Sequence, residues 1–176
     1  MGANLPLARL WKAALADALP HLGPHTLLLD HPTGLALRTL DGHAPHVRAR
    51  TLVLTTSAVP EYLDDLWDAG IALLAVNVTD ARTLRLLLNS LTRGDRVRWQ
   101  APPSPLTPAE RRVLRLAAAG ETSKRIAQQL ALSDRTVQNT LSRIFERLHL
   151  AGRTEAALYY WGTPPPLLPE TATPVP

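Results

Sequence analysis

Apolar residues in the C-terminal third of the chain recur every three or four positions, the spacing that predicts amphipathic helices. Four short helices are expected, at residues 108–119, 123–130, 134–148 and 153–161. Capping signals agree with these bounds, because Thr107 and Glu110 fit a capping box, Gly120 can end the first helix and Ser133 can cap the third. Only residues 131–133 separate the second helix from the third, and so short a turn fixes the angle between them.

The third of these helices has two unlike faces. Its apolar face carries Val137, Leu141, Ile144, Phe145 and Leu148. The opposite face is centred on Asn139 and carries Arg135, Gln138, Ser142, Arg143 and Glu146. Amide side chains can pair with adenine through two hydrogen bonds, and arginine can bind guanine or phosphate, so this face suits the major groove of DNA. Any solvated surface helix is also polar on one side, and polarity alone leaves both interpretations open.

The N-terminal half alternates apolar runs with helical patterns. Three runs have the continuous apolar character of strands in a parallel sheet covered on both faces: residues 26–29, 51–54 and 71–76. Helical spacing is found in four segments: residues 5–19, 35–40, 60–69 and 80–92. This order predicts an α/β domain with an incomplete, three-stranded parallel sheet. Residues 26–29 would form an apolar edge that either residues 5–19 or a second subunit covers.

Proline marks the expected domain boundaries. The segment WQAPPSP predicts a short, stiff linker, and six prolines in the last 13 residues predict a disordered tail. The expected organisation is an α/β domain, a linker, an all-α four-helix domain and a Pro-rich tail, at residues 1–98, 99–105, 106–162 and 163–176.

Composition narrows the classes of function. The formal charge is +4, of which +3 lies in residues 101–176, so the basic surplus coincides with the four-helix segment. The chain has no cysteine, no apolar run of membrane-spanning length and no signal-peptide layout at its start, so we expect a cytoplasmic protein without membrane contact. The histidines have no metal-site spacing, and we find no catalytic motif or phosphate-binding loop. We therefore predict no cofactor, no metal and no enzymatic activity.

Three segments resemble the C-terminal DNA-binding domain of the LuxR/NarL (GerE-type) transcription regulators. They are LTPAERRVLRLAAAG, SKRIAQQLALSDRTVQNTLSRIFERL and GRTEA, and the resemblance covers roughly residues 105–161, about a third of the chain. The resemblance implies a helix-turn-helix domain that binds double-stranded DNA. It implies that Gln138, Asn139 and Ser142 face the bases. Thr136 also matches the family and is expected among the DNA-binding residues. Phosphate contacts are implied for Lys124, Arg135, Arg143 and Arg147.

Three departures from this family concern the strength of DNA binding. The family often has lysine and histidine where this chain has Gln138 and Thr140, and Glu146 adds a negative charge. Fewer cations predict weaker binding with a smaller salt dependence.

The last helix ends in Tyr159, Tyr160 and Trp161. In the family this helix pairs two DNA-bound copies, but the three aromatic residues would equally close the domain's own core.

Residues 24–97 resemble the second part of a response-regulator receiver domain. The resemblance places the phospho-acceptor at Asp30, the switch hydroxyl at Thr55 and the end of the last strand at Asn77. Phosphotransfer in a receiver needs a pair of acids for Mg²⁺ and a lysine at that last strand end. The segment before residue 26 contains Asp17 as its only acid, and the lysine position holds asparagine. We therefore interpret Asp30, Thr55 and Asn77 as a vestigial receiver pocket.

These patterns together predict a transcriptional regulator that reads DNA through residues 133–148 as a homodimer, independently of phosphorylation. The α/β half would serve dimerisation or bind a protein partner. Two alternatives stay open. The chain could be a scaffold or interaction protein with weak or no DNA binding, or a phosphorylation-dependent response regulator.

Overall fold

A computed structural model describes residues 24–78, 80–91 and 96–162. The chain divides into two compact units, residues 1–104 and 105–176. The helix expected at residues 5–19 and the Pro-rich tail at 163–176 lie outside the described residues. Within the described part of the chain, every helix is too short or too polar to span a bilayer.

In the described part of the first unit, four strands form a parallel sheet in the order β1-β2-β3-β4. The strands are β1 (Thr26–Asp30), β2 (Thr51–Thr55), β3 (Leu73–Val76) and β4 (Val97–Trp99). β2 and β3 are buried along their whole length, as continuous apolar runs predict for central strands. The expected parallel α/β fold is confirmed, but the expected number of three strands is wrong. β4 was missed because its three residues, VRW, contain too few apolar positions to give a strand pattern.

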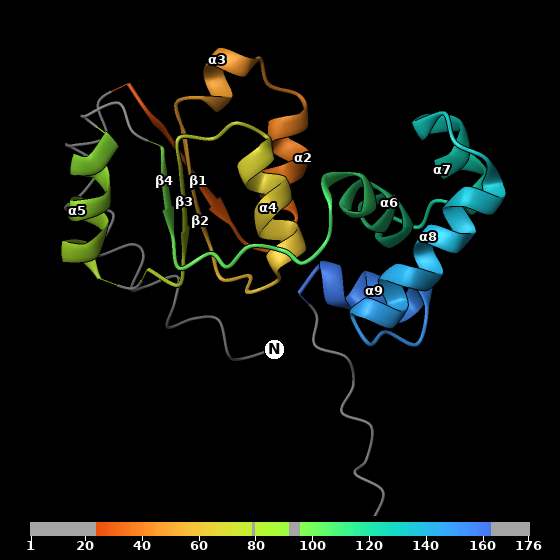
Figure 1. Ribbon diagram of the computed structural model, residues 1–176. Coiled ribbons are helices and arrows are strands. Elements are labelled where there is room, and N and C mark those ends of the chain that lie inside the picture. The colour runs from red at the N-terminus through yellow and green to blue at the C-terminus, as the bar shows by residue number, and fades with distance from the viewer. Residues whose placement is uncertain (1–23, 79, 92–95, 163–176) are drawn as a thin grey trace, which may run out of the picture. The chain divides into compact units, whose positions relative to one another are not determined.

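Helices cover both faces of this sheet. They are α2 (Leu35–Asp41), α4 (Pro60–Asp68) and α5 (Ala81–Leu91), whereas the short helix α3 (Pro45–Arg48) has no buried residue. Figure 1 shows α5 on one face and α2 with α4 on the other. Four leucines of α5 pack on Leu52, Leu54 and Leu73 of the central strands, and Leu27 and Leu29 of β1 lie at the margin of this cluster. Gly70 has φ +88° and ends α4, as its position after the apolar stripe predicts.

In its described residues, 105–162, the second unit consists of four helices, as the periodicity predicts. They are α6 (Pro108–Ala118), α7 (Ser123–Leu130), α8 (Asp134–Arg147) and α9 (Arg153–Tyr160). The capping box of Thr107 and Glu110 is present, Gly120 follows α6 with φ +88°, and the Ser133 hydroxyl caps α8. Every one of these helices contributes at least one fully buried side chain to the core. These side chains are Leu114, Ile126, Val137, Ile144 and Tyr160.

Burial in the second unit departs from the helical pattern at a few positions. Leu116, Leu130, Phe145 and Leu148 were expected to point inward and are only half-buried. Thr140 is buried instead, although a polar residue gives no signal of burial. Arg111 is buried too, with its guanidinium donating to the carbonyl of Leu106 at 3.2 Å. In so small a domain the helix ends and the stripe margins stay partly in solvent, so apolar residues there are not fully covered.

Candidate nucleic-acid interface

The turn between α7 and α8 is held by backbone geometry and two hydroxyl caps. Ala131 takes the left-handed conformation (φ 54°), and the N–H of Leu132 donates to the carbonyl of Ala127 at 2.9 Å. The Thr122 hydroxyl caps α7, and the Ser133 hydroxyl accepts from the N–H of Thr136 at 3.0 Å to cap α8. These bonds end one helix and begin the next within three residues, which fixes the direction of α8 relative to α7.

One side of α8 is packed and the other is open. Val137 and Ile144 are fully buried and Leu141 is nearly so. Gln138, Asn139, Ser142, Arg143 and Arg135, which alternate with them, are all exposed. The faces predicted from the sequence are therefore the faces observed, and the polar side chains project away from the core.

A shallow, open groove runs along the exposed face of α8. It is lined by Thr136, Asn139, Ser142 and Arg143, which lie on one helical stripe. Three of these residues can both donate and accept hydrogen bonds, and the fourth is a fixed cation. No bulky apolar side chain is among them, so the stripe can approach the edges of base pairs.

Two side chains on this face are partly ordered by the helix itself. The amide of Gln138 donates to Asp134 at 3.3 Å, and the hydroxyl of Ser142 donates to the carbonyl of Gln138 at 3.1 Å. The side chain of Asn139 makes no hydrogen bond to another described residue of 96–162. Its amide therefore has a donor and an acceptor available for an external partner.

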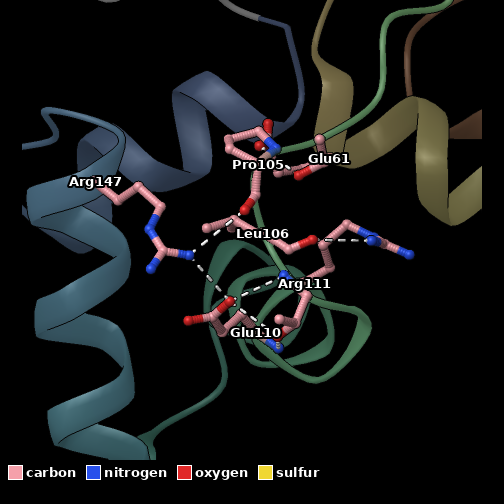
Figure 2. A network of polar contacts seen from close by, with 8 residues as sticks. Glu61, Pro105, Leu106, Glu110, Arg111 and Arg147 are labelled. Carbon is pink, nitrogen blue, oxygen red and sulfur yellow. Dashed lines mark hydrogen bonds and ion pairs between the residues drawn. The ribbon is translucent and has the colours of Figure 1, made fainter.

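The predicted phosphate-contacting cations differ in their surroundings. Lys124, Arg135 and Arg143 are exposed. Arg147 is turned toward the start of α6, where its guanidinium lies 3.4 Å from the carboxylate of Glu110 and 3.5 Å from the carbonyl oxygen of Pro105 (Figure 2). Arg147 thus ties the end of α8 to the cap of α6, which competes with the phosphate contact predicted for it.

Glu110 supports this tie as an anion. Its carboxylate accepts hydrogen bonds from the N–H and the hydroxyl of Thr107, both at 2.9 Å. The N–H of Thr107, more than the nearby arginines, lowers the pKa of Glu110 below its ordinary value. Glu110 therefore stays charged at neutral pH. Its negative charge favours the orientation in which the side chain of Arg147 points toward α6.

α9 closes the domain with side chains whose role the sequence left open. Tyr160 is fully buried, and the indole N–H of Trp161 donates to the carbonyl of Ala118 at 2.9 Å. Arg153, which sequence reasoning did not single out as structural, donates to the carbonyl of Glu121 at 2.9 Å and to the hydroxyl of Ser123 at 2.7 Å. Tyr160 and Trp161 thus serve the core of their own domain, and Tyr159 is half-buried.

The first unit brings two residues of the predicted vestigial pocket together. The Thr55 hydroxyl donates to the carboxylate of Asp30 at 2.9 Å, and both residues are fully buried. The same carboxylate accepts from the hydroxyl of Tyr62 at 2.7 Å and from the N–H of Ala36 at 2.9 Å. Asn77 follows β3 with its side chain exposed, and only its backbone N–H reaches Thr55, donating to the carbonyl at 3.0 Å.

Tyr62 was not predicted as part of this pocket, because in the sequence it reads as an ordinary apolar position of α4. It is fully buried, and its hydroxyl accepts from the N–H of Gly34 at 3.0 Å while donating to Asp30. Burial, reinforced by the Asp30 carboxylate, raises the pKa of Tyr62 above its ordinary value, so the hydroxyl keeps its proton. Asp30 is thereby enclosed by three donors.

The similarity to known proteins covers the second unit and extends into the first. The family model described as bacterial regulatory proteins, luxR family, matches residues 104–160. The uncharacterized transcriptional regulatory protein YvfU of Bacillus subtilis is 34% identical over 116 residues, which cover 62% of this chain and 58% of that protein. The chain thus spans somewhat more than half the length of this relative. A nitrate/nitrite response regulator protein homolog of Haemophilus influenzae is 30% identical over 154 residues, covering 78% of this chain and 74% of the relative.

Among solved structures, the complex of the two-component response regulator RcsB with DNA is similar at 23% identity. The similarity covers 87% of this chain and 82% of the RcsB chain, with a TM-score of 0.39.

Proposed function

Because the chain belongs to the luxR family of bacterial regulatory proteins, we propose that it regulates transcription as a homodimer that reads DNA through α8, without phosphorylation. The observation that carries this proposal is the open face of α8. Its groove residues Thr136, Asn139, Ser142 and Arg143 point outward while Val137 and Ile144 anchor the helix in the core. A rigidly held helix with such a face is what major-groove recognition requires.

The exposed side chains divide into two roles. Asn139 and Gln138 carry amides that can pair with adenine, and Arg143 can take guanine or phosphate. Lys124 on α7 and Arg135 at the start of α8 are exposed cations suited to phosphate oxygens, which position the helix without reading sequence. Arg147 contributes to this surface less, since Glu110 already holds it.

Two copies would place their α8 helices in successive major grooves, about 10 base pairs apart. Dimerisation matters here because one copy offers few phosphate contacts, and doubling them raises affinity steeply at a given salt concentration. In sedimentation velocity at tens of micromolar, we expect the full chain to run as a dimer. A monomer at that concentration would contradict the homodimer.

Independence from phosphorylation is supported by the surroundings of Asp30. Its carboxylate is fully buried and accepts hydrogen bonds from Thr55, Tyr62 and the backbone of Ala36. An attacking carboxylate must reach a solvent-borne phosphodonor, and the position that would neutralise the phosphate holds Asn77, which has no charge.

Incubation with a small-molecule phosphodonor and Mg²⁺, followed by intact mass measurement, tests this point. We expect the mass of the wild type and the mass of the Asp30→Asn variant both to stay unchanged. A stoichiometric phosphate that disappears in Asp30→Asn would overturn the proposal and favour a phosphorylation-dependent response regulator.

A scaffold or interaction protein with little DNA affinity remains the second candidate. One observation favours it: the ion pair between Arg147 and Glu110 removes a cation from a face on which Asp134 and Glu146 already place negative charge. This candidate predicts no preferred DNA sequence at low salt.

A further inference from the structure

β1 leaves one edge of the sheet open within the described residues. In the parallel register with β2, Thr26 lies opposite Thr51, and its N–H donates to the carbonyl of Arg50 at 2.9 Å. The N–H and C=O groups of successive residues point to opposite sides of a strand, so those of Thr26, Leu28 and Asp30 point toward β2. Leu27 and Leu29 turn theirs outward. In the described part of the chain, β2 is the only strand that pairs with β1.

Among the described residues, this edge lacks the features that normally block pairing with another strand. Residues 26–29 are Thr-Leu-Leu-Leu, without charge or proline, and the three leucines are only half-buried. Edge strands of soluble proteins are usually shielded by lysine, proline, a bulge or a covering element. The edge at β4 is different, since it has three residues and its Arg98 is engaged with Asp64 at 2.5 Å and with the carbonyl of Ala101 at 2.8 Å.

We propose that the β1 edge is the dimerisation surface and that its occupant is β1 of a second copy of this chain, paired antiparallel about Leu28. The inference rests on the homodimer proposed above and specifies where its two subunits meet. A two-fold axis perpendicular to the sheet at Leu28 would join two four-stranded sheets into one continuous sheet.

The register follows from which backbone groups face outward. Around an axis at Leu28, Leu27 lies opposite the partner's Leu29, and these two residues exchange both N–H···O bonds. The two-fold axis repeats this exchange between Leu29 and the partner's Leu27, so the two pairs of residues make four hydrogen bonds in total. The carbonyl of Leu29 accepts one bond already, from the N–H of His31 at 3.0 Å, and a carbonyl oxygen can accept a second.

Side chains agree with the same register. Leu27 and Leu29 lie on the sheet face that packs against the α5 cluster, so the two cross-strand pairs would extend that apolar surface across the interface. Leu28 would meet its own copy on the other face. The segment Thr26–Leu29 carries no charge, so two copies meet without like-charge repulsion. This self-complementarity favours a second copy over an unrelated peptide.

A cysteine at the axis tests the register. Directly opposite residues in a non-hydrogen-bonded antiparallel pair have Cα atoms about 4.5 Å apart, within the range that a disulfide spans. The chain has no cysteine, so Leu28→Cys carries a single thiol. Under mild oxidation we expect most of Leu28→Cys to become a covalent dimer. The matched control Thr26→Cys should stay uncrosslinked, because residue 26 lies four positions from its own copy in this register, roughly 13 Å away.

A charge at the axis provides a second, independent readout. In Leu28→Lys two ammonium groups would meet, and the dissociation constant of the dimer should rise at least about 10-fold, whereas Leu86→Lys on the exposed face of α5 should leave it unchanged. Circular dichroism of both variants checks that they fold.

The possible outcomes distinguish a wrong β1 interface from a wrong homodimer. A wild-type dimer in sedimentation whose Leu28→Cys variant does not crosslink would overturn the β1 interface and leave the homodimer standing. A wild-type monomer would overturn both. A Leu28→Cys variant that stays monomeric and whose thiol is protected from alkylating reagent would mean that β1 is covered within a single copy of the chain, which also overturns the inference.

Discussion

Replacing Asp30 by alanine is expected to make backbone hydrogen exchange in β1 and β2 about 100-fold faster, which corresponds to a loss of about 3 kcal/mol in the stability of the first unit. The carboxylate accepts hydrogen bonds from Thr55, Tyr62 and the N–H of Ala36. Removing it leaves these donors buried without an acceptor, and each such group costs about 1–3 kcal/mol, reduced in part by relaxation. The effect is large because the whole network is inaccessible to water.

Matched variants make this expectation specific. Asp41→Ala removes an exposed carboxylate from the end of α2 and should change stability by less than about 0.5 kcal/mol. Tyr62→Phe removes one donor and should cost less than Asp30→Ala does. If Asp30→Ala exchanged no faster than Asp41→Ala, the carboxylate would not be a structural element, and its interpretation as a reactive group would regain weight.

Asn139→Ala is expected to weaken binding to the preferred DNA sequence about 10- to 100-fold, or about 1–3 kcal/mol, and to relax specificity at one base pair. Asn139 lies at the centre of the exposed face of α8 and lines its groove. Because its side chain is exposed, the substitution should leave the melting temperature of the domain within a few degrees of the wild type. Fluorescence anisotropy with labelled duplexes measures the affinity.

Lys124→Ala is the matched contrast for Asn139→Ala. A phosphate contact carries no sequence information, so this variant should weaken binding about equally on every duplex and reduce the slope of log affinity against log salt by about 1. If Asn139→Ala behaved in the same way, with equal losses on all sequences, the recognition face would be assigned wrongly.

Local signals predicted the second unit well. Apolar periodicity located all four helices, and Thr107, Glu110, Gly120 and Ser133 marked their ends because capping depends on residues close in sequence. The polar face of α8 followed from the same periodicity. Long-range contacts were not predictable in this way. The family resemblance implies a phosphate contact for Arg147, and nothing near it in sequence shows that Glu110, 37 positions away, lies against it.

The first unit shows the same limit. Continuous apolar runs identified β1, β2 and β3, but β4 was too short to detect. The receiver resemblance places Asp30 and Thr55 in one pocket. The third partner, Tyr62, was not predicted, because an aromatic residue in an amphipathic helix predicts burial without showing what its hydroxyl meets. Burial of Thr140 and Arg111 depends on neighbours in space that the local pattern does not encode.

Selection of bound sequences from a random pool of duplex DNA by the full chain, at a salt concentration below about 100 mM, is the most direct test of sequence reading by α8. We expect enrichment of a repeated element with half-sites about 10 base pairs apart, and loss of preference at one position of each half-site in Asn139→Ala. A pool that remains random after repeated rounds would contradict sequence reading by α8 and would favour the scaffold.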